Sequence, residues 1–75
     1  MIGAAAIGRE VRRARTALGL TQSRLAARAG VSLPTVQNVE AGRANPAHGT
    51  LSRLLGPLGL SLEIRPPRAD WDALA

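Results

Sequence analysis

The sequence predicts an all-α protein, in which four short helices form one compact bundle and a single β-strand follows near the C-terminus. Seventy-five residues provide one small domain and no room for a separate catalytic domain. Up to Leu58, apolar residues recur with the period of a helix, and Gly19, Gly30 and Gly42 divide this stretch into short segments. The chain has no Phe, no Tyr and one Trp, so its core must consist of aliphatic residues, which favours tightly packed helices.

The first two helices are delimited by capping residues and glycines. The first is expected over residues 4–18, and Gly19 follows where a left-handed residue would end it. One face of this segment carries four apolar residues at helical spacing: Ile7, Val11, Ala14 and Leu18. The second helix is expected over residues 22–29, with Thr21 as its N-cap and Gly30 at its end.

The third helix is expected over residues 33–40, with Ser32 as its N-cap. It and the preceding helix are two short helices joined by a tight glycine turn, and the small residues Ala26 and Ala29 allow them to approach closely. This is the pattern of a helix-turn-helix. The exposed side of the third helix carries short polar side chains, which suits the major groove of DNA. An ordinary hairpin in a small helical bundle is the alternative.

The fourth helix is expected over residues 46–58, because an Asn cap followed by Pro is a start signal at Asn45-Pro46. A start at Thr50 is the alternative and would give a helix of two turns. Pro57 predicts a kink or an early end, since Pro removes a backbone donor and clashes with the preceding turn. We expect His48 to be partly buried on this helix.

A strand is expected over residues 60–65, because the period of the pattern changes from 3.6 to 2 after Gly59 and Pro66 ends the alternation. A lone strand leaves backbone N–H and C=O groups unpaired, and no other segment has the pattern of a strand. We therefore expect the same strand of a second chain to pair with it across a homodimer axis. The dimerisation residues are then Leu60, Leu62 and Ile64. A fifth helix or a disordered end is the alternative.

The chain is strongly basic, with a formal net charge of +5 from ten arginines against five acidic residues. A small basic domain is typical of nucleic-acid binding, and a solvated arginine-rich surface is the alternative. The absence of Cys excludes disulfides, thiolate metal sites and cysteine nucleophiles, and one His cannot complete a metal site, so we expect no cofactor and no enzyme. No apolar stretch approaches the ~20 residues of a membrane span, and we expect a cytoplasmic protein.

The central residues carry a specific motif. The stretch from Leu18 to Arg43 contains GLTQ, then LA, AGVS and an E.G pair, and it resembles the Cro/repressor (Xre-type) helix-turn-helix family. The resemblance covers about residues 7–60. It implies a sequence-specific DNA-binding transcriptional repressor that binds double-stranded operator DNA as a homodimer on the bacterial nucleoid.

The resemblance also assigns roles by position. Gln22, which opens the second helix, and Arg43, in the loop after the third, match residues that contact phosphates. The surface that reads DNA matches five residues of the third helix and its cap: Ser32, Leu33, Thr35, Gln37 and Asn38. Arg15 and Glu40 match an ion pair that ties the first helix to the end of the third, with two unrelated surface charges as the alternative. Leu33 stands where the family often has Gln, so base reading depends more on the polar residues.

The run from Leu54 to Pro66 resembles the end of HipB-like antitoxins, where a strand follows the last helix. This resemblance implies the antitoxin of a toxin-antitoxin operon, which represses its own operon and binds a HipA-like kinase toxin. A stand-alone phage-type or housekeeping repressor of the Xre family, with no toxin, is the alternative.

The predicted domain organisation is a DNA-binding domain over residues 1–65, which includes the dimerisation strand, and a flexible tail over residues 66–75. The tail is acidic and holds Trp71, the single aromatic residue of the chain. Because aromatic residues often anchor partner interfaces, we predict that Trp71 contacts the toxin. A Trp that folds back onto its own domain is the alternative.

Overall fold

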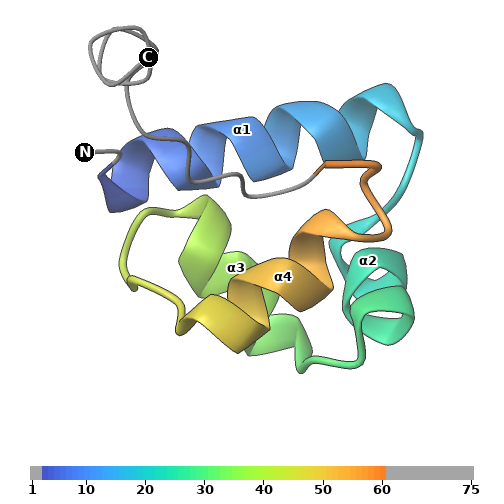
Figure 1. Ribbon diagram of the computed structural model, residues 1–75. Coiled ribbons are helices and arrows are strands. Elements are labelled where there is room, and N and C mark those ends of the chain that lie inside the picture. The colour runs from blue at the N-terminus through green and yellow to red at the C-terminus, as the bar shows by residue number, and fades with distance from the viewer. Residues whose placement is uncertain (1–2, 61–75) are drawn as a thin grey trace, which may run out of the picture.

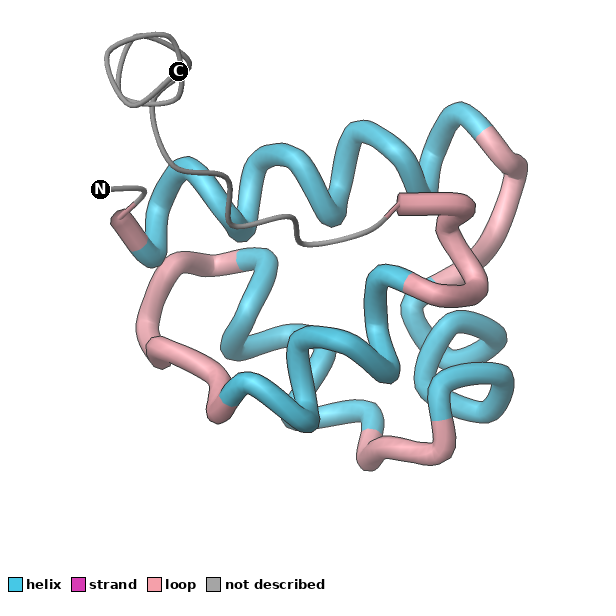
Figure 2. Tube along the Cα trace, viewed as in Figure 1, coloured by secondary structure: helices cyan, strands magenta, loops and turns pink. Residues whose placement is uncertain are grey.

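The computed structural model describes residues 3–60, which form four helices joined by short loops, with no strand among them (Figures 1 and 2). The helices are α1 (Ala4–Ala17), α2 (Gln22–Ala29), α3 (Leu33–Glu40) and α4 (His48–Leu55). The longest helix, α1, lies along one side of the bundle, and the three shorter helices gather beside it (Figure 1). The expected four-helix fold is confirmed, whereas the predicted strand over 60–65 lies, except for Leu60, outside the described residues.

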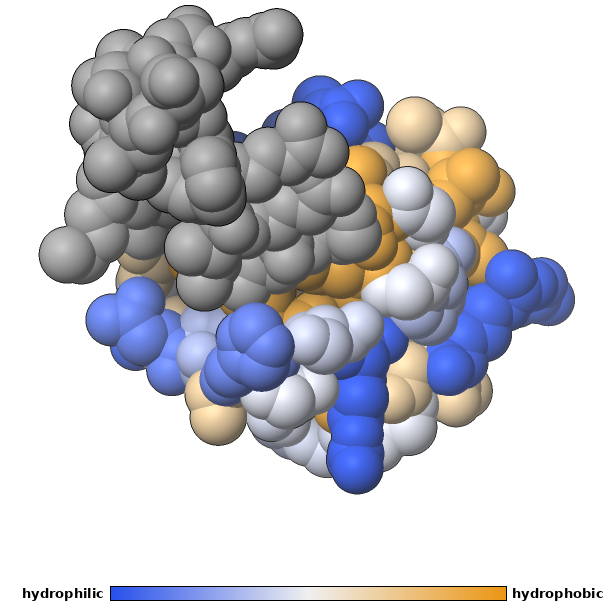
Figure 3. All heavy atoms as spheres, viewed as in Figure 1, coloured by the Kyte–Doolittle hydropathy of each residue, from blue (hydrophilic) through white to orange (hydrophobic). Residues whose placement is uncertain are grey.

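The core is aliphatic, as the composition requires. Both α1 and α2 pack against α3, and α2 also packs against α4. Twelve buried residues make one cluster: Val11, Ala14, Leu20, Leu25, Ala26, Ala29, Val36, Val39, Leu51, Leu54, Leu55 and Leu58. Burial of their apolar surface is the main source of stability. On the face shown in Figure 3, hydrophobic side chains extend from the middle to the upper right, and strongly hydrophilic ones lie at the left, at the bottom and on the right.

The turn between α2 and α3 follows the local signals of the sequence. Thr21 caps α2, because its hydroxyl accepts a hydrogen bond from the Arg24 backbone N–H at 3.0 Å. Gly30 ends α2 with a φ of 69°, a left-handed conformation in which a Cβ atom would be strained. The next N–H, of Val31, then donates to Ala26 O at 3.0 Å and closes the turn.

The fourth helix is shorter than the sequence predicts. It begins at His48, because Ala47 before it has an extended backbone with a ψ of 154°, so the expected start at Asn45-Pro46 is wrong. His48 is exposed on its first turn, and its expected partial burial is also wrong. The helix ends at Leu55, in agreement with the early end that Pro57 predicts.

The contact between α1 and α3 depends on Gly8, which no pattern in the sequence marks. Gly8 is buried on α1, and a Cβ atom added there would lie 2.3 Å from Val39 O and 2.9 Å from Glu40 O. Only a residue without a side chain permits this approach of the two backbones. The close packing brings the end of α3, with Glu40, against α1.

Candidate nucleic-acid interface

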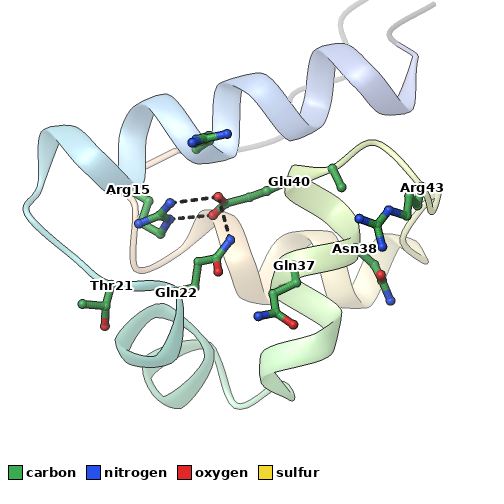
Figure 4. A pocket seen from close by; sticks show the side chains of 9 residues that line it. Arg15, Thr21, Gln22, Gln37, Asn38, Glu40 and Arg43 are labelled. Atoms are coloured by element: carbon green, nitrogen blue, oxygen red, sulfur yellow. Dashed lines mark hydrogen bonds and ion pairs between the residues drawn. The ribbon is translucent and has the colours of Figure 1, made fainter.

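Arg15 of α1 and Glu40 of α3 form a bidentate ion pair (Figure 4). Arg15 Nε donates to Glu40 Oε2 at 2.6 Å, and Arg15 Nη2 donates to Glu40 Oε1 at 2.9 Å. The two side chains are 12% and 3% exposed. Arg15 Nη1 also donates to Leu20 O at 2.8 Å. The guanidinium therefore ties α1 both to the end of α3 and to the loop that leads into α2.

Gln22 joins this network from the first residue of α2. Its Nε2 donates to Glu40 Oε1 at 3.2 Å, so the carboxylate of Glu40 accepts hydrogen bonds from Arg15 and Gln22 together. An amide nitrogen carries two hydrogens, which leaves the second N–H of Gln22 for another acceptor. Glu40 therefore orients a donor that comes from the start of a neighbouring helix.

Two arginines of α1 have carboxylate partners, and each pair shifts pKa values. The hydrogen bond with Glu40 raises the pKa of Arg15 above its ordinary value, against the opposing effect of desolvation. The contribution of this shift to stability is therefore present at neutral pH and is lost as the pH rises through that raised value. On the exposed side of α1, the hydrogen bond from Arg13 lowers the pKa of Glu10. The contribution of this shift to stability is lost as the pH falls through the lowered value.

An open hollow of about 650 Å³ lies beside the ion pair. Its wall is formed by residues of α1, α2 and α3, of the loop before α2 and of the loop after α3. It brings together four of the side chains assigned to DNA contacts: Gln22, Gln37, Asn38 and Arg43. Figure 4 shows the first three in a row between Arg15 and Arg43. The remaining lining residues, besides the ion pair, are Arg12, Thr21 and Ala41.

The other three residues assigned to DNA contacts lie at the start of α3 and do not line the hollow. Ser32 Oγ accepts a hydrogen bond from the Thr35 backbone N–H at 3.2 Å and lies 2.7 Å from Thr35 Oγ1. The Ser32 hydroxyl therefore caps the helix. Leu33 is 36% exposed, which is unusual here, because few large apolar residues of the described chain reach solvent.

The residues assigned to dimerisation and toxin binding are mostly outside the described part of the chain. Leu60 is half-buried and packs against the core. Its N–H donates to Leu55 O at 2.9 Å, which closes the turn after α4. Leu62, Ile64 and Trp71 lie beyond the described residues.

The chemistry of the hollow suits an anionic partner. Three arginines and one glutamate line it, so the lining carries a net charge of +2, and three amide side chains add neutral donors. Guanidinium and amide N–H groups are the donors that bind phosphate oxygens and base edges in protein–DNA complexes.

Between residues 3 and 60, no three His, Cys, Asp or Glu side chains gather as a metal site would require. No helix in this part of the chain is long and apolar enough to cross a membrane.

Known proteins share both the sequence pattern and the fold. Residues 11–64 match the profile of the family described as Helix-turn-helix. The chain belongs to this family. The match includes all of α2, α3 and α4, so the resemblance to Xre-type helix-turn-helix proteins is confirmed.

A relative in Haemophilus influenzae is described as an uncharacterised HTH-type transcriptional regulator and is 40% identical over 63 residues. The alignment covers 84% of this chain and 64% of the relative, so the chain spans less than two thirds of the relative's length.

Two solved structures have the same fold. The restriction-modification controller protein C.AhdI from Aeromonas hydrophila superposes with a TM-score of 0.74 at 31% identity, over 77% of this chain and 88% of the controller. A chain of the SINR protein/SINI protein complex superposes with a TM-score of 0.70, over 91% of this chain and 73% of that chain. At 24% identity, the second likeness shows the fold alone.

Proposed function

We propose that this protein is a sequence-specific DNA-binding transcriptional repressor that acts on promoter DNA in the cytoplasm of a bacterium. The observation that carries the proposal is the hollow, where Gln22, Asn38 and Arg43 gather beside the exposed side of α3. In a helix-turn-helix the second helix of the motif, here α3, enters the major groove. The relative described as a transcriptional regulator supports the same class of function.

In this proposal the residues divide between positioning and reading. Gln22 lies at one end of the row in the hollow and Arg43 lies beyond the other end, and both bind phosphates of the backbone. Gln37 and Asn38, both exposed on α3, hydrogen-bond to base edges. Leu33 has no hydrogen bond to offer and contacts a thymine methyl group instead.

Replacing Asn38 and Arg43 separately should distinguish reading from positioning. Asn38→Ala should reduce the preference for the operator over unrelated DNA by about 1–3 kcal/mol, because a base contact is lost. Arg43→Ala should weaken binding to both DNAs alike, because phosphate contacts carry no sequence information. The measurement is a gel-shift titration with a duplex selected from a random pool and a scrambled duplex of the same length. Equal losses of preference in the two variants would contradict the separate roles.

We also propose that the protein acts as a homodimer through residues 60–65. The alternation of Leu60, Leu62 and Ile64 with polar residues supports this. A dimer would present two α3 helices to half-sites about 34 Å apart on one side of the DNA.

Leu62→Pro should convert the dimer to a monomer, because Pro removes a backbone donor and the change also removes an apolar side chain. Sedimentation velocity should show the monomer at micromolar concentration, while far-UV circular dichroism retains most of the helical signal. Glu63→Ala, on the opposite face of the predicted strand, is the control and should stay dimeric. A dimeric Leu62→Pro variant would place the dimer contact elsewhere.

A finer form of the proposal is that the protein is a HipB-like antitoxin. Its support is the sequence of residues 54–66 and the acidic tail with Trp71, which suits a protein partner better than DNA. The partner would be a HipA-like kinase toxin, and a stand-alone repressor is the alternative. Co-purification of the untagged product of the adjacent gene is the test, and a neighbour that is no kinase would favour the alternative.

A further inference from the structure

We propose that Arg12, on α1, binds the phosphate backbone of the DNA and so extends the interface beyond the helix-turn-helix motif. This inference rests on the proposed function. It assigns a binding role to a residue that the sequence motif leaves out, because Arg12 lies on the helix before the two that form the motif.

The position of Arg12 carries the inference. Arg12 is exposed and lines the same hollow as Gln22, Asn38 and Arg43. It lies one turn before Arg15, and residues three apart share a face of a helix. Because the ion pair of Arg15 turns this face toward the end of α3, Arg12 is directed to the same side.

The pairing of charges on α1 separates Arg12 from its neighbours. Arg15 is neutralised by Glu40, and Arg13 is bound to Glu10. Among residues 3–60, the guanidinium of Arg12 makes no ion pair and no hydrogen bond to a side chain. The cations of the hollow without a carboxylate partner in this part of the chain are therefore Arg12 and Arg43.

The two cations approach the hollow from different elements, Arg12 from α1 and Arg43 from the loop after α3. The donors of Gln22 and Asn38 belong to the same wall. A guanidinium presents a planar fork of donors that matches two phosphate oxygens. Arg12 would therefore hold the strand on the α1 side of the hollow, while Arg43 holds it on the other side.

The test compares Arg12→Ala with Arg13→Ala, which remove the same charge from adjacent exposed positions of α1. Binding to a fluorescein-labelled duplex of about 20 base pairs is followed by anisotropy between 50 and 200 mM NaCl. Each lost phosphate contact should reduce the slope of log K against log salt by about 0.9. When the salt rises from 50 to 200 mM, Arg12→Ala should therefore lose about 3.5-fold less affinity than the wild type for each bound chain. Arg13→Ala should keep the wild-type slope.

Thermal unfolding should give the same midpoint for the wild type and Arg12→Ala, because the Arg12 side chain is exposed. Arg12→Lys, which keeps the charge, should keep most of the slope. Equal slopes for the wild type and Arg12→Ala would overturn this inference and leave the proposed function standing. A wild type that binds no duplex at 50 mM salt would overturn the proposed function, and the inference with it.

Discussion

Replacing Arg15 with alanine should lower the free energy of unfolding by about 3–5 kcal/mol. The change leaves the carboxylate of Glu40, 3% exposed, with Gln22 as its one remaining side-chain donor in the described structure. An unpaired buried charge is costly because water no longer solvates it. Arg15→Ala also removes the hydrogen bond from Arg15 Nη1 to Leu20 O, which holds the loop before α2. Urea denaturation followed by circular dichroism at pH 7 measures the effect.

Two further variants distinguish the effect of losing the buried ion pair from the effect of losing one positive charge. Arg13→Ala removes an arginine whose partner, Glu10, is exposed, and it should leave the urea midpoint nearly unchanged. The double variant Arg15→Met/Glu40→Leu replaces both members by apolar side chains and should recover much of the stability that Arg15→Ala loses. An Arg15→Ala variant as stable as Arg13→Ala would show that the Arg15–Glu40 pair does not support the fold.

Gly8→Ala should lower the free energy of unfolding by about 1–3 kcal/mol, although alanine is the better helix former. The added methyl group would lie 2.3 Å from Val39 O, so α1 and α3 must move apart. Because Glu40 O lies 2.9 Å from the same position, this movement should also disturb the ion pair with Arg15. A thermal melt measures the loss of stability.

Gly49→Ala is the matched control, since it makes the same change within another helix. No atom lies within 4 Å of a Cβ added at Gly49, and its φ is not positive. This variant should therefore be more stable by about 0.4–1 kcal/mol, through the reduced freedom of the unfolded chain. Opposite signs for the two glycines are the expected result. Stabilisation by Gly8→Ala would show that the close approach of α1 and α3 is not required.

Local signals account for the elements that the sequence predicted well. α2 spans the predicted residues, because Thr21 and Gly30 act within one turn of the chain and need no distant partner. Ser32 caps α3 in the same way. The start of α4 was not predictable from such a signal, since Asn45-Pro46 is compatible with a cap and with an extended loop. The extended backbone at Ala47 selects the loop.

Part of the candidate site could be predicted from the sequence. The resemblance assigned DNA contacts to Gln22, Asn38 and Arg43, and the structure brings these residues to one hollow. Arg12 was visible in the sequence only as a residue off the apolar stripe of its helix. Its spacing of three from Arg15 was a signal that the two arginines share a face of the helix, but the spacing does not say what that face meets.

By itself, the sequence determined the all-α class, the positions at which most helices begin and end, and membership of a helix-turn-helix family. These depend on period, capping and glycine, which act over a few residues. Only the tertiary structure decided that Gly8 is the point of contact between α1 and α3, and that Glu40 binds Arg15 and Gln22 at once. Periodicity defines a face relative to its own helix axis, whereas the neighbour of that face depends on how all the helices pack together.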